Sequence, residues 1–120
     1  GIWKTFEDYV NGAERYFLGK NALFYFGDLD FEGILIFEHL IGQKRYRESG
    51  IHIFKEAYEK MLDKAWQLGF SRLPDMKEKQ NANIGTSFLS AFDAERRHQI
   101  LELLDMGKYI PQEILNEHDW

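Results

Sequence analysis

The sequence predicts an α/β fold, in which helices flank a parallel sheet and the C-terminal part is helical. The apolar run at 22–26 has no polar alternation, which is typical of a strand covered on both faces. Helical spacing of apolar residues follows this run, and a second short apolar run lies at 51–54. Strand, helix and strand in this order predict a right-handed β-α-β unit.

The composition is that of one folded domain. The chain has 120 residues, 44% hydrophobic and 16% aromatic, which is enough to form a core. It contains no Cys, which excludes disulfides, thiolate zinc sites and cysteine nucleophiles. The formal net charge of -5 disfavours binding of nucleic acid by overall charge. Because no apolar segment reaches roughly 18 residues and no secretory signal is present, we expect a soluble cytoplasmic protein with no membrane partner.

The N-terminal half is predicted to alternate helices and strands. Apolar residues at intervals of three and four predict an amphipathic helix at 5–18. A central strand is expected at 22–27, followed by a helix that is apolar nearly all round and ends at Gly42. The polar residues 43–50 predict a loop before the second strand. Since the sheet pattern begins with a central strand, we expect the first strand or strands of the domain to lie upstream.

The C-terminal half is predicted to be mainly helical. A helix at 55–68 has one buried side and is closed by Gly69. The segment 70–86 is the longest irregular stretch, and we expect it to be mobile. The remaining predicted helical segments are a turn at 87–92, a helix capped by Asp93 that runs through Met106 to Gly107, and a last short helix that begins at Pro111.

Asp28 and Asp30 follow the central apolar run at a spacing of two. In extended backbone this spacing places both carboxylates on the same side, at the C-terminal end of the strand, where open α/β sheets bind ligands. Two close carboxylates repel unless a cation neutralises them, and Mg²⁺ prefers such oxygen ligands. Gly27 and Gly33 would let the backbone turn tightly and approach a phosphate. The pattern predicts a metal site for phosphate chemistry.

The same acids also fit a purely structural role. Asp30 is a good N-cap for a helix that begins at Phe31 or Glu32. Asp28 could be a loop acid that accepts hydrogen bonds from nearby amides. The spacing alone does not decide between the two roles.

The run Tyr-Phe-Gly-Asp-Leu-Asp-x-x-Gly at 25–33, followed by an apolar helix, resembles a motif of Toprim domains. More narrowly, it resembles the C-terminal domain of the JetD family of Wadjet plasmid-defence proteins. That family is in turn similar to the A subunit of type IIB DNA topoisomerases. The segment Gly-Lys-Tyr-Ile-Pro-Gln-Glu at 107–113 is also similar to the end of the family's domain.

This resemblance implies a partial Toprim-like, Rossmann-like sheet and divalent-metal-dependent DNA cleavage in a full-length parent. By the match, Asp28 and Asp30 would be the catalytic metal ligands for Mg²⁺ or Mn²⁺, with Glu32 as a weaker ligand. Gly27 and Gly33 would be the positions that shape the backbone. DNA and a condensin-like (SMC) complex would be the partners of the parent.

Two departures from the family pattern matter for activity. Toprim domains carry a further catalytic Glu at the end of an earlier strand, and Glu7 and Glu14 lie in a predicted helix and do not replace it. We therefore expect the isolated chain to be inactive. Type IIB relatives also tend to have Pro where Phe31 stands.

Two other functions are considered beside the nuclease. A haloacid dehalogenase type phosphatase also begins with a strand and two such acids, but Phe31 and Glu32 stand where a Gly-Thr pair usually follows. A non-catalytic interaction module is the other alternative, because Trp3, Trp66 and Phe70 could form a docking or self-association surface.

Overall fold

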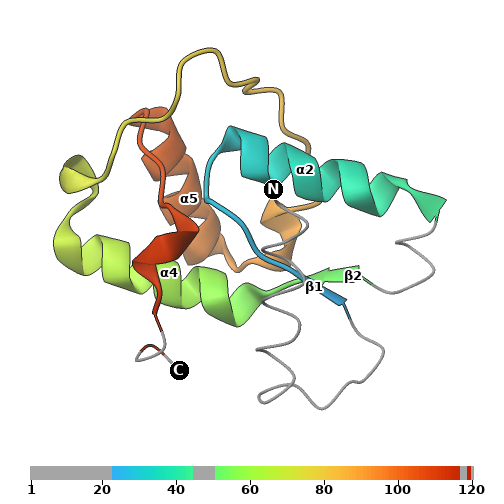
Figure 1. Cartoon of the computed structure of the whole chain (residues 1–120), viewed down its shortest axis with the longest axis horizontal. Coiled ribbons are helices and arrows are strands. Elements are labelled where there is room, and N and C mark those ends of the chain that lie inside the picture. Colours follow the sequence, from blue (N-terminus) through green and yellow to red (C-terminus); the bar gives the residue numbers. More distant parts are fainter. Residues whose placement is uncertain (1–22, 45–50, 117–118, 120) are drawn as a thin grey trace.

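The computed structural model describes residues 23–44, 51–116 and 119, which form a mixed α/β fold (Figure 1). Strand β1 (Leu23–Tyr25) pairs in parallel with strand β2 (Ile51–Ile53), with Leu23 opposite Ile51. Helix α2 (Phe31–Gly42) lies between the two strands in the chain, and helix α4 (Lys55–Leu68) follows β2. The β-α-β order predicted from the sequence is confirmed.

The C-terminal part contains one more long helix and three short 3-10 helices among the described residues. Helix α5 (Ala94–Asp105) packs against α4. None of the described helices is long and apolar enough to cross a membrane. The short 3-10 helices are η1 (Phe70–Arg72), η2 (Leu89–Ala91) and η3 (Gln112–Ile114).

Local signals place the helix ends where the sequence predicted them. The Asp30 carboxylate accepts from the Gly33 amide at the start of α2, and the Asp93 carboxylate accepts from the Arg96 amide at the start of α5. Gly69 and Gly107 follow α4 and α5 with φ of 97° and 72°, a backbone conformation that favours glycine.

The predicted strands are too long. Strand β1 ends at Tyr25 rather than at residue 27, and β2 ends at Ile53 rather than at residue 54. The Phe54 amide donates the last inter-strand hydrogen bond, to the Tyr25 carbonyl at 2.8 Å, and α4 begins at the next residue. Pairing ends because the partner strand turns into a helix. The described residues therefore show two parallel strands and do not establish a full Rossmann-like sheet.

Some predictions lie outside the described residues or differ in detail. The helix predicted at 5–18 and most of the loop predicted at 43–50 are outside them. The last short helix is the 3-10 helix η3, which begins after Pro111. The irregular segment predicted at 70–86 starts instead with the 3-10 helix η1. Residues 73–86 have little regular structure, and the expectation that the segment is mobile stays a prediction.

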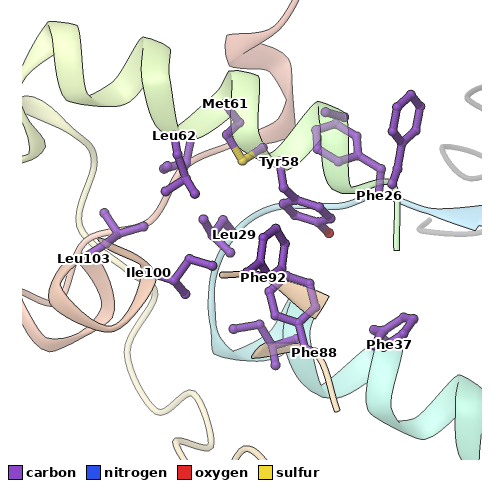
Figure 2. Close-up of a cluster of buried hydrophobic side chains, with 14 of the residues drawn as sticks. Phe26, Leu29, Phe37, Tyr58, Met61, Leu62, Phe88, Phe92, Ile100 and Leu103 are labelled. Carbon is purple, nitrogen blue, oxygen red and sulfur yellow. The ribbon is translucent and has the colours of Figure 1, made fainter. Parts of the chain in front are cut away.

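The core is rich in aromatic rings that meet edge to face. Tyr58 lies 4.9 Å from Phe26 and 5.1 Å from Phe88, measured between ring centroids. Leu29, which is fully buried, lies among residues of α4 and α5 in Figure 2. The connection between β1 and α2 is therefore anchored in the core through Leu29.

Candidate metal site at the start of helix α2

Leu29 fixes the connection that carries the two acids. Its amide donates to the Ile110 carbonyl at 2.8 Å, and its own carbonyl accepts from the Ile110 amide at 3.2 Å. Both side chains are fully buried. The carboxylates of Asp28 and Asp30, on either side of Leu29 in the sequence, accept hydrogen bonds from other segments and from the start of α2.

Asp30 is both the N-cap of α2 and a member of the candidate site. Its Oδ1 atom accepts from the Gly33 amide at 2.7 Å, and its Oδ2 atom accepts from Gln80 Nε2 at 3.1 Å. The residue is only 6% exposed. The structural role proposed for Asp30 from the sequence is thus present, and the second oxygen is covered by Gln80.

Asp28 is a half-buried carboxylate with two acidic neighbours, Asp30 and Glu113, and one basic neighbour, Lys77. Its Oδ1 atom accepts from the Gln112 amide at 2.8 Å. Burial raises the pKa of Asp28, and the charges of Asp30 and Glu113 raise it further, whereas the Gln112 hydrogen bond and the charge of Lys77 lower it. A cation beside Asp28 would offset the energetic cost of keeping this carboxylate ionised.

Glu32 and the two glycines surround the acids in different ways. Glu32 is exposed in the first turn of α2, and its amide donates to Gln80 Oε1 at 3.3 Å. Gly33 has no room for a side chain, because a Cβ there would collide with the Asp28 carbonyl oxygen. Gly27 is buried, and its amide donates to the Tyr58 hydroxyl at 2.9 Å. In the structure Gly33 lets the first turn of α2 come close to the Asp28 carbonyl, and the proposed approach of either glycine to a phosphate stays a prediction.

Two buried tyrosines support the site from the core side. The Tyr25 hydroxyl donates to the Gly33 carbonyl at 2.6 Å, and the Tyr58 hydroxyl accepts from Gly27. Burial raises the pKa of Tyr25, and the charges of Asp30, Asp28 and Glu32 add to this shift. All three acids therefore lie near enough to Tyr25 to disfavour ionisation of its hydroxyl.

Sequence reasoning missed the polar residues that close the site. Gln80 and Lys77 come from the irregular segment after η1, and Gln112 and Glu113 come from η3. The only sequence signal for any of them was the Gln-Glu pair in the segment at 107–113, which belongs to the family resemblance. Nothing in the sequence pointed to Gln80.

The donor set fits a hydrated magnesium ion better than a fully caged metal. Among the described residues, no group of three or more His, Asp or Glu side chains is arranged to hold a metal ion. Magnesium keeps several water ligands and is commonly bound by one or two carboxylates. In the described part of the chain no residue makes a hydrogen bond to Asp28 Oδ2, whereas each oxygen of Asp30 already accepts one hydrogen bond. Asp28 would be the main ligand, with Asp30 as the second.

No family model matches the chain, and neither a curated protein nor a solved structure matches it significantly. The comparisons therefore assign no family. A functional proposal depends on the geometry around Asp28 and Asp30 and on the sequence motif that contains them.

Proposed function

We propose that Asp28 and Asp30 hold Mg²⁺ or Mn²⁺ against a DNA phosphate, as part of Toprim-type DNA cleavage by a longer parent protein. One observation carries the proposal, namely a half-buried carboxylate at Asp28 that follows the buried residues 25–27 at the end of β1 and lies near other acids. The motif resemblance to the JetD family supplies the substrate class. By the same resemblance, the parent would act in plasmid defence with a condensin-like complex.

Each residue of the site has a defined task in this proposal. Asp28 in its ionised form would bind the cation, and Asp30 would add a second oxygen whose position the N-cap fixes. The first amides of α2 lie beside Asp30 and favour an anionic group such as a phosphate. When bound, the metal would polarise the phosphodiester and stabilise the charge that develops on it. A catalytic Glu from an upstream strand would be needed for turnover, so the isolated chain is expected to bind metal without cleaving DNA.

A magnesium titration followed by amide NMR tests this proposal. We expect selective shifts of the amides of residues 28–33 at millimolar Mg²⁺ in the wild-type chain. Asp28→Asn should remove them. Asp105→Asn, at the exposed C-terminal end of α5, should keep them, and it serves as a control for the loss of one acidic charge. The proposal fails if the wild-type amides of residues 28–33 do not move more than those elsewhere.

A protein-interaction role is the second candidate, and one observation favours it. Trp66 on α4 is 57% exposed, more than any other large apolar side chain among the described residues. Phe70 is 7% exposed and packs edge-on against Trp66, so the predicted surface cannot include it as an exposed residue. Trp3 lies outside the described residues. Light scattering of wild type and Trp66→Ala would test self-association, which the variant should weaken.

The phosphatase alternative stays a prediction. It would require Asp28 to act as a nucleophile rather than as a metal ligand alone. Hydrolysis of a generic aryl phosphate by the parent, lost in Asp28→Asn, would support it.

A further inference from the structure

Residues 77–85 cross over the start of α2 and are called the strap here. In Figure 1 this yellow segment arches over the N-terminal end of the helix. Two polar anchors join the strap to α2. Gln80 bonds to Asp30 and Glu32 near the start of the helix, and the Gly85 amide donates to both carboxylate oxygens of Glu38 at 2.8 Å.

The side chain of Gln80 occupies both kinds of ligand position at once. Its Nε2 atom donates to Asp30 Oδ2, where a cation would bind, and its Oε1 atom accepts from the Glu32 amide, where a phosphate oxygen would bind. A carboxylate can only accept and an amide N–H can only donate, so these two partners fix the orientation of the Gln80 carboxamide. The uncharged Gln80 carboxamide thus takes the place of a cation at Asp30 and of a phosphate oxygen at the Glu32 amide.

The strap is held by few apolar contacts. Of its nine residues, 77–85, only Gln80 and Ile84 are partly buried, and the others are exposed. Lys79 has a φ of 66°, a left-handed conformation that is unfavourable for a residue other than glycine. A pocket lined by Leu35 and Ile36 of α2 and by residues 78–81 separates part of the strap from the helix. Segments of this kind open at low free-energy cost.

We propose that Gln80 is a latch, and that the strap must release Asp30 before this carboxylate binds a divalent cation. The inference rests on the proposed metal site and adds a mode of regulation to it. The apparent metal affinity then equals the intrinsic affinity multiplied by the fraction of molecules in which Asp30 is free. A partner that lifts the strap would raise the affinity without touching the metal ligands.

Metal binding by latch variants tests the inference in the full chain. In a calorimetric titration with Mg²⁺, and in Mn²⁺ broadening of NMR signals, Gln80→Ala should bind about tenfold more tightly than wild type, the factor that one charge-assisted hydrogen bond contributes. Hydrogen exchange at the Glu32 amide should become faster in the same variant. Asn83→Ala, an exposed amide of the same strap, should change neither quantity.

A second variant releases the other end of the strap. Glu38→Ala removes the acceptor of the Gly85 amide and leaves Gln80 and Asp30 unchanged. It should also tighten metal binding, although it removes an acidic charge that would by itself favour cations. Tighter binding in this variant supports the strap mechanism independently of the Gln80 substitution.

The outcomes separate failure of the latch from failure of the metal site. If wild type binds metal and Gln80→Ala binds it equally or more weakly, Gln80 supports Asp30 rather than blocking it, and the latch is wrong while the site stands. If neither wild type nor any variant binds metal in the millimolar range, the metal site is wrong and the latch is wrong with it.

Discussion

Gly33, in the first turn of α2, is a position where sterics and helix propensity oppose each other. A Cβ here would meet the Asp28 carbonyl oxygen well inside 3.0 Å, a separation that real Cβ atoms essentially never show, and Asp30 Oδ1 at 3.1 Å. The carbonyl cannot retreat freely, because the adjoining Leu29 amide donates to the Ile110 carbonyl. Gly33→Ala must therefore displace the N-cap, the Leu29–Ile110 bridge or both.

The expected loss of stability follows from these contacts. Overpacking costs about 1–3 kcal/mol, and loss of the Asp30 cap adds about 1 kcal/mol. Replacement of Gly by Ala inside a helix returns about 1 kcal/mol through helix propensity. We expect Gly33→Ala to lower the free energy of unfolding by about 1–3 kcal/mol and the melting temperature by about 10 °C.

Urea denaturation followed by far-UV circular dichroism measures the effect, with Gly42→Ala as the matched control. Gly42 is the last residue of the same helix, and a Cβ there would meet nothing within 4 Å. The control should unfold at the wild-type urea concentration or slightly above it. Equal midpoints for Gly33→Ala and Gly42→Ala would refute the packing argument.

Two further predictions concern the charge and the hydroxyl groups of the site. Burial raises the pKa of Asp28 in the folded state above its ordinary value of 3.8, so stability is lost as the pH rises from 3.8 to that raised pKa and does not change further above it. Asp28→Asn should therefore increase the urea midpoint at neutral pH and leave it unchanged at a pH below 3.8, and a decrease at neutral pH would contradict this. Tyr58→Phe leaves the buried Gly27 amide without its hydroxyl partner and should cost about 2 kcal/mol, whereas Tyr25→Phe removes a donor from the Gly33 carbonyl and should cost about 1 kcal/mol. Equal costs in thermal denaturation would contradict the proposed difference between a donor and an acceptor left unpaired.

Strand length shows where local sequence patterns mislead. The apolar run at 22–27 has the pattern of a buried strand throughout, and Phe26 is fully buried. Its pairing nevertheless ends at Tyr25, because β2 has only three residues before α4 begins. The burial of a segment can be predicted from its own residues, but the length of a paired strand also depends on how far the partner strand extends.

For the described residues, the sequence by itself determined the order of the strands and long helices and the positions of the helix ends. These features depend on groups within about one turn of each other, such as the Asp30 cap on Gly33 and the positive φ of Gly69. Only the tertiary structure decided what surrounds the two acids. Gln80 reaches Asp30 across 50 residues and Gln112 reaches Asp28 across 84, and such contacts arise from packing of distant segments that leaves no local pattern.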